Sequence, residues 1–136
     1  MKRTVSGMTL IELMITVVVI AILAVIAITM YTTQILAGRR ADAINTIYSI
    51  SLAEERYRTT NTTYGTLAQV WGGVTASTGG YYTLAVSNVT ATAYTITATA
   101  VGQQASDKEG ATSCTPLVLT ATAGAFTKSP AVCWPS

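Results

Sequence analysis

The chain divides into an apolar first part and a polar second part. Residues 13–30 carry no charge, and most polar side chains lie beyond Gln34. A helix that rises about 1.5 Å per residue needs about 20 apolar residues to cross a hydrocarbon layer of about 30 Å. The apolar run over residues 8–30 therefore predicts one membrane-spanning helix.

Beyond the apolar run, hydrophobic side chains recur at helical spacing at Ile44, Ile47, Ile50 and Tyr57. No proline occurs before Pro116, so nothing in this stretch forces a break. We therefore expect one helix over residues 9–58, apolar in its first half and amphipathic in its second. Asn61 and Gly65 are expected to end it.

Two groups of charged side chains lie on the amphipathic half of this helix: Arg39, Arg40 and Asp42 near its start, and Glu54, Glu55, Arg56 and Arg58 near its end. We interpret both groups as solvated surface of mixed sign. The alternative is salt bridging between neighbouring copies in an assembly, where weak surface pairs can fix a register when they are repeated.

The second part of the chain alternates between polar and apolar residues in short runs. Four strands are predicted, over residues 81–86, 93–100, 117–122 and 125–128. The Gly-, Thr- and Ser-rich stretch 67–80 before them is expected to be a surface loop. One face of the sheet must be covered, and the amphipathic half of the helix is the available cover. The predicted fold class is α+β, one long helix against a four-stranded antiparallel sheet.

Charge gives little support for a nucleic-acid partner. The formal net charge of the 136 residues is +2, and it comes from Lys2 and Arg3, because the remaining basic and acidic side chains balance. Nucleic-acid binding is driven by clustered Lys and Arg side chains that release counterions. The sequence does not show such a cluster.

The N-terminal residues set the orientation and hold one unusual carboxylate. Lys2 and Arg3 keep the N-terminus cytoplasmic and send the rest of the chain across the membrane. Gly7 precedes the apolar run, so cleavage there would leave the helix on the mature protein. Glu12 lies inside the run and needs a partner, which the new α-amino group of Met8 would supply. The alternative is that Glu12 lies at the headgroup level of a single-pass anchor.

Cys114 and Cys133 lie near the C-terminus, on the far side of the predicted membrane helix from Lys2 and Arg3. That compartment is oxidising, so we predict a disulfide between them. A metal site would need further cysteines or histidines, and the sequence has no histidine. Closing a loop of this size contributes roughly 3 kcal/mol to the stability of a small core.

The sequence offers no candidate catalytic residues, cofactor site or metal site. It has no histidine, no glycine-rich phosphate loop and no cluster of carboxylates, so neither a nucleophilic triad nor a metal centre can be assembled. Asp107, Lys108 and Glu109 are interpreted as the solvated tip of a hairpin rather than as a calcium site. We therefore expect a protein that is not an enzyme.

Residues 7–13 read Gly-Met-Thr-Leu-Ile-Glu-Leu and follow a short basic leader. This segment resembles the prepilin peptidase motif of type IV pilins and of type II secretion pseudopilins. The resemblance implies cleavage after Gly7, N-methylation of Met8, and a role for Glu12 in assembly through the amine of a neighbouring subunit. The chain departs from the family at Met8, where phenylalanine is most frequent, and at Thr29, where many major pilins have a helix-kinking proline.

The resemblance extends over the whole chain, because the order of helix, loop, meander sheet and C-terminal disulfide is that of the type IV pilin fold. Segments 39–43, 55–58, 61–65, 128–130 and 133–134 look like those of PilE-type minor pilins of type IVa systems. The implied organisation is a leader over residues 1–7, a transmembrane and filament-core helix over 8–33, and a periplasmic or extracellular head over 34–136.

The function implied by this resemblance is that of a structural subunit, a minor pilin of a surface filament used in adhesion, twitching motility or DNA uptake. Its partners would be other pilin subunits, the prepilin peptidase and N-methyltransferase, the inner-membrane assembly machinery, and the bacterial inner membrane before assembly. Two alternatives remain from the sequence. One is a pseudopilin of a type II secretion system, and the other is a membrane-anchored binding module that uses Trp71 and Trp134.

Overall fold

The computed structural model describes residues 7–135, which form two compact units that meet between Ile35 and Leu36. The predicted leader lies outside the described residues except for Gly7. The elements are α1 (Leu10–Arg58), α2 (Leu67–Trp71), β1 (Tyr82–Ser87), β2 (Ala93–Ala100), the 3₁₀ helix η1 (Gly102–Ser106), β3 (Lys108–Glu109), β4 (Thr112–Ser113), β5 (Leu117–Thr122), β6 (Ala125–Ser129) and the 3₁₀ helix η2 (Ala131–Cys133).

The single long helix is confirmed: α1 has 49 residues, and its bounds differ from the predicted ones by one residue at the start. The helix ends before two β-branched residues, Thr59 and Thr60, and an asparagine, Asn61. The side-chain amide of Asn61 donates to the carbonyl of Tyr57 at 2.8 Å, which satisfies one of the carbonyls left free at a helix C-terminus. Thr59 N donates to Arg56 O at 3.2 Å and tightens the last turn.

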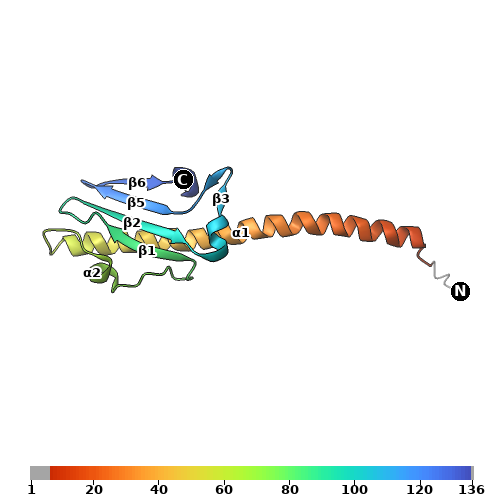
Figure 1. Ribbon diagram of the computed structural model, residues 1–136, viewed down its shortest axis with the longest axis horizontal. Coiled ribbons are helices and arrows are strands. Elements are labelled where there is room, and N and C mark those ends of the chain that lie inside the picture. Colours follow the sequence, from red (N-terminus) through yellow and green to blue (C-terminus); the bar gives the residue numbers. More distant parts are fainter. Residues whose placement is uncertain (1–6, 136) are drawn as a thin grey trace, which may run out of the picture. The chain divides into compact units, whose positions relative to one another are not determined.

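The four predicted strands are confirmed, and they form one antiparallel sheet in the order β1-β2-β5-β6 (Figure 1). The register is continuous across the sheet, with Leu84 opposite Ala98 and Ile96 opposite Leu119. On the inner face, β1, β2 and β5 bury every second side chain, as expected for a sheet covered on one side. The sheet therefore needs a partner on that face.

The covering element is the part of α1 that belongs to the second unit, here called the head. Its buried residues follow helical spacing: Arg40, Ala43, Ile44, Thr46, Ile47, Ile50, Ser51 and Glu54. They lie against the buried positions of the sheet, chiefly Tyr82, Leu84, Tyr94, Ile96, Ala98, Leu117, Leu119 and Ala121. The predicted α+β fold with one sheet covered by the long helix is thus confirmed.

The predicted surface loop over residues 67–80 is partly wrong, because it contains α2. The sequence held the signal, since Thr66 and Gln69 form a capping box in which Thr66 N donates to Gln69 Oε1 at 2.8 Å. Gly72, at φ +63°, ends the helix in a conformation that glycine favours. Beyond it, Ala76 forms a bridge with Thr83 and covers the free edge of β1.

Candidate functional site

The first turn of α1 holds the residues that the sequence singled out for processing and assembly. Thr9 precedes the helix, and its hydroxyl accepts a hydrogen bond from Glu12 N at 3.3 Å. Its carbonyl accepts one from Leu13 N at 3.2 Å. Thr9 is therefore the N-cap, and the sequence Thr-x-x-Glu is that of a capping box. This signal is readable in the sequence and explains why the helix begins there.

Gly7 and Met8 lie just before this cap and are open to solvent. Nothing comes within 4 Å of a Cβ added at Gly7, and the Met8 side chain is 66% exposed. The peptide bond between them is thus free of packed neighbours within the described residues. A peptide bond exposed in this way is sterically accessible to a peptidase.

The Glu12 carboxylate differs from the other polar side chains of the apolar segment. Thr16 Oγ1 donates to Leu13 O at 2.8 Å, and Thr29 Oγ1 donates to Val25 O at 3.0 Å. These hydroxyls are satisfied inside the helix and can enter an apolar environment without a further partner. Within residues 7–135, the Glu12 side chain makes no hydrogen bond or ion pair. Glu12 is thus available to a second molecule.

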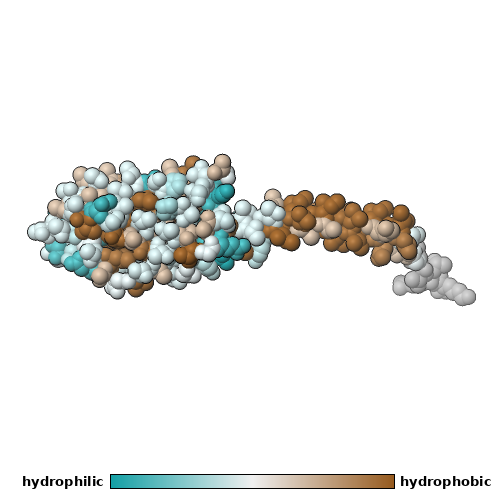
Figure 2. Space-filling view, in the orientation of Figure 1, coloured by the Kyte–Doolittle hydropathy of each residue, from teal (hydrophilic) through white to brown (hydrophobic). Residues whose placement is uncertain are grey.

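The apolar segment offers a continuous hydrophobic surface, drawn in brown in Figure 2. Its most hydrophobic window has a mean hydropathy of 3.0, and none of that window is buried. Each Å² of apolar surface removed from water contributes about 25 cal/mol, so this segment is strongly favoured in lipid or against other apolar helices. Length and hydropathy are those of a helix that can cross a membrane.

The head contains the predicted disulfide, which joins Cys114 to Cys133 across a sequence separation of 19 residues. It ties the chain before β5 to the segment after β6. Both cysteines are buried in the core, and Trp134 beside them is only 7% exposed. The disulfide therefore fixes the C-terminal segment to the sheet.

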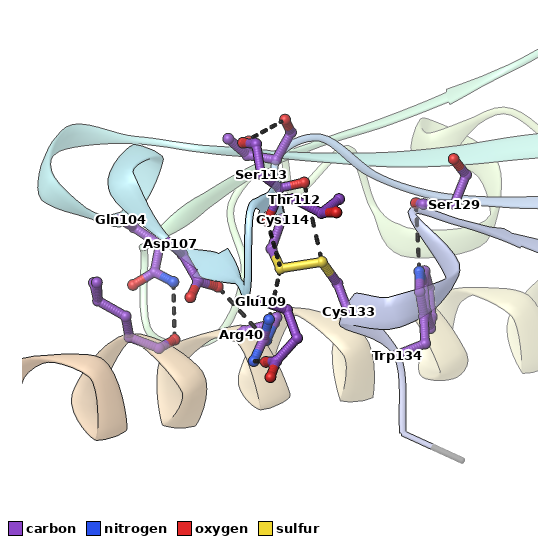
Figure 3. Close-up of a disulfide and its surroundings, with 12 residues drawn as sticks. Arg40, Gln104, Asp107, Glu109, Thr112, Ser113, Cys114, Ser129, Cys133 and Trp134 are labelled. Atoms are coloured by element: carbon purple, nitrogen blue, oxygen red, sulfur yellow. Dashed lines mark hydrogen bonds and ion pairs between the residues drawn. A yellow bond between two sulfur atoms is a disulfide. The ribbon is translucent and has the colours of Figure 1, made fainter. Parts of the chain in front are cut away.

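An ion-pair cluster lies against this disulfide, and Figure 3 shows Arg40 rising toward it from α1. Arg40 Nη2 donates to Glu109 Oε2 at 2.7 Å, and Arg40 Nε lies 3.5 Å from Asp107 Oδ2. Arg40 Nη1 contacts Cys114 Sγ. The Arg40 and Asp107 side chains are 10% and 3% exposed, so this is a buried pair rather than a surface one.

The interpretation of these charges as solvated surface was wrong for Arg40 and Asp107. The reason is η1, which turns the chain after β2 back toward α1. Burial raises the pKa of the Asp107 carboxyl, and the nearby Arg40 guanidinium opposes that rise. In the same turn, Gln104 Nε2 donates to the carbonyl of Leu36 at 2.9 Å and to the hydroxyl of Tyr82 at 3.0 Å. The cluster thus connects α1, η1 and the sheet.

Glu54, at the other end of the buried stripe of α1, is also not the solvated residue that was expected. It is fully buried, and its Oε2 accepts a hydrogen bond from Gly65 N at 2.8 Å. Burial raises the pKa of its carboxyl, while the hydrogen bond from Gly65 lowers it. Glu54 therefore holds the chain that follows α1 against the helix.

The two tryptophans named for the binding-module alternative do not form an exposed platform. Trp134 is buried, and Trp71 is partly buried against the core. Trp134 instead packs edge-to-face on Tyr48, with ring centroids 5.9 Å apart, and Lys128 Nζ lies 5.4 Å from the Tyr48 ring. Both tryptophans serve packing. Within residues 7–135, no group of three or more His, Cys, Asp or Glu side chains is placed to share a metal ion.

Two family models match the chain. Residues 29–118 match the model described as type IV minor pilin ComP, DNA uptake sequence receptor. Residues 2–28 match the prokaryotic N-terminal methylation motif, so the two matches adjoin. No curated protein matches the chain.

Proposed function

The chain belongs to the ComP family of type IV minor pilins, and on this premise we propose that it is cleaved between Gly7 and Met8 and methylated at Met8. It is a structural subunit, a minor pilin with the type IV pilin fold, and not a pseudopilin. Cleavage would leave α1 at the N-terminus of the mature chain. The mature subunit would then be built into the pilus through this helix.

The observation that carries this proposal is the Glu12 carboxylate, which has no partner among residues 7–135, in a segment whose threonine hydroxyls donate to carbonyls of the same helix. In an apolar bundle, a lone carboxylate is costly, whereas a carboxylate paired with an amine is tolerated. The new α-amino group of Met8 is a cation, and it would lie at a similar depth in the apolar bundle to the Glu12 carboxylate. Pairing it with Glu12 of a neighbouring subunit would fix the axial register between helices, because a slip would leave both charges unpaired.

The proposed partners follow from this chemistry. Before assembly, the apolar half of α1 would hold the subunit in the bacterial inner membrane, with the head on the far side. A prepilin peptidase with N-methyltransferase activity would process it, and inner-membrane assembly proteins would extract it into the fibre. There its neighbours would be other pilin subunits. The disulfide supports the placement of the head in an oxidising compartment.

Intact-mass and N-terminal analysis of the protein from membranes and from sheared fibres tests the proposal. We expect a chain that starts at methylated Met8 in both fractions. The variant Gly7→Leu places a bulky side chain at the cleaved bond, and it should keep Met1 and stay in the membrane fraction. Recovery of a chain that begins at Met1 from fibres would overturn the proposal.

A second candidate function is reception of DNA, which the family description favours. The head has exposed basic side chains at Arg56, Lys108 and Lys128, and Arg40 is not among them because it is buried in ion pairs. Backbone phosphates would bind these exposed cations. Only a few cations are free in this part of the chain, so we propose binding with a shallow dependence on salt.

Fluorescence anisotropy with a labelled DNA duplex measures this binding. We expect log K to fall linearly with log salt, with a slope smaller than about 4, because each neutralised phosphate contributes about 0.9. The variants Arg56→Gln and Lys128→Gln should each lower the slope by about 1. A slope that neither variant changes would place DNA contacts elsewhere, and no binding at low salt would exclude this second function.

A further inference from the structure

A groove opens between α1 and β6 on the inner side of the sheet. It is lined by Tyr48, Ser51, Leu119, Phe126 and Lys128. Phe126 and Lys128 are opposite buried residues of β5 and so face inward, yet every residue of β6 is exposed. The groove has a volume of about 340 Å³, near the lower end of the range for small-ligand sites, about 300–1,000 Å³. It therefore admits a single ring system rather than a folded partner.

The aromatic side chains that line this groove are the most exposed ones of the head. Tyr48 on α1 is 38% exposed and Phe126 on β6 is 49% exposed. Every other aromatic side chain of residues 36–135 is buried or half-buried. Exposed rings in a concave apolar site are typical of surfaces that bind a flat ring by stacking. The groove offers one such ring on each of its two elements.

The charge of the groove is positive. Of the described residues that line it, Lys128 alone is charged. Its ammonium lies 5.4 Å from the centroid of the Tyr48 ring and 5.7 Å from that of the Trp134 ring, and it forms no ion pair within residues 7–135. An anion bound there would therefore lie beside the aromatic rings. This combination favours a ligand that joins a flat apolar ring to a negative charge.

The Tyr48 side of the groove is ordered before any ligand binds. The Tyr48 ring packs edge-to-face on Trp134, with ring centroids 5.9 Å apart. Trp134 Nε1 donates to the carbonyl of Ser129 at 3.3 Å, as Figure 3 shows, and the preceding residue, Cys133, is held by the disulfide. Binding would thus cost little conformational entropy on this side.

From these observations we propose that the groove binds an unpaired base of a DNA strand, with the base against Tyr48 and Phe126 and a neighbouring phosphate on the Lys128 ammonium. Every base has a π face that can stack on an aromatic ring, and its phosphate supplies the negative charge. A base paired within a duplex is stacked on its neighbours, so the bound base must come from a single strand or be flipped out. The inference rests on DNA reception, the second function proposed above, and adds the form of DNA that the head holds.

Fluorescence anisotropy with two labelled oligonucleotides of about 12 nucleotides tests the proposal, because single-strand-binding folds cover about 4–16 nucleotides. One is a single strand of thymidines, and the other is a stable abasic strand with the same phosphates and no bases. We expect the full-length chain, in detergent micelles, to bind the thymidine strand about tenfold more tightly at equal salt. Stacking of one base adds a factor of this size.

The variant Tyr48→Leu/Phe126→Leu keeps apolar side chains but removes both rings. It should bind the two strands with equal affinity, while its affinity for a DNA duplex stays that of the parent. The matched control Tyr31→Leu removes an exposed ring outside the head and should keep the tenfold ratio. Phe126→Leu alone changes one exposed residue of an edge strand, so it tests the groove even if the double variant does not fold. It should lower the ratio about threefold, which is half of the stacking free energy.

The outcomes separate the groove from DNA reception as a whole. Equal affinity of the parent for both strands would overturn the groove proposal, and so would a ratio that the leucine variants leave unchanged or that Tyr31→Leu lowers equally. If a duplex still binds in such a case, DNA reception stands and only the groove is wrong. No binding of any of the three DNA forms at low salt would overturn both.

Discussion

Replacement of Glu12 by alanine is expected to lower incorporation of the subunit into fibres by about tenfold or more. The proposed contact pairs the Glu12 carboxylate with the α-amino group of a neighbouring subunit in an apolar helix bundle. Removal of the carboxylate leaves that amine buried and uncompensated, and breaking a buried pair costs much more than losing a surface one. The head should be unaffected, because Glu12 lies outside the compact unit that begins at Leu36.

The measurement is the amount of subunit in sheared fibres relative to membranes, determined by immunoblot. Glu12→Gln keeps the size of the side chain without its charge and should fail like Glu12→Ala, whereas Glu12→Asp should retain part of the activity. Thr9→Ala removes the N-cap hydroxyl but keeps Glu12, so it separates helix capping from charge pairing. Normal fibre levels for Glu12→Gln would show that the charge is not needed, and the proposed pairing would be wrong.

The elements with strong periodicity were predictable from the sequence. The apolar run and the spacing of Ile44, Ile47 and Ile50 gave the long helix, since helical period and the absence of proline agree over the whole stretch. Strict alternation in residues 93–100 gave β2 with its observed bounds. At these places local pattern and tertiary packing favour the same structure, so the pattern was sufficient.

The burial of two charged side chains was not predicted, although both lie at positions that the helical period assigns to the buried face of α1. Arg40 and Glu54 lie on the same stripe as Ile47 and Ile50, one at each end. Their charge suggested that both side chains are exposed to solvent, because an ionised group is rarely buried without a partner. The partners come from segments distant in sequence, Asp107 in one case and Gly65 N in the other. Such contacts depend on the path of the connecting turns, which spacing alone does not determine.

The residues proposed for processing and assembly were singled out by another kind of signal. Gly7, Met8 and Glu12 stood out because a basic leader, a small residue and a lone carboxylate occur in a fixed order. In the structure Gly7 and Met8 precede α1, Glu12 lies in its first turn, and all three are exposed.

Replacement of Arg40 by methionine is expected to destabilise the head by about 3–5 kcal/mol, which is a large share of the stability of a small domain. Methionine keeps much of the apolar volume but removes the cation that faces Asp107 and Glu109. Glu109 is half exposed and can be solvated, whereas Asp107 is buried and would remain without a countercharge. The loss therefore comes mainly from Asp107.

The pH dependence distinguishes this cause from a simple packing defect. Burial raises the pKa of Asp107 above its unfolded value, and removal of Arg40 raises it further, so the folded state then favours the protonated acid more strongly. The destabilisation by Arg40→Met should thus be largest above the raised pKa and should shrink as pH falls toward about 4, the unfolded value. Chemical unfolding followed by circular dichroism at several pH values measures it. The double variant Arg40→Met/Asp107→Asn removes the buried charge as well and should recover much of the stability at neutral pH. A loss that is independent of pH, or that the second substitution does not relieve, would mean that Arg40 acts by packing rather than by compensating Asp107.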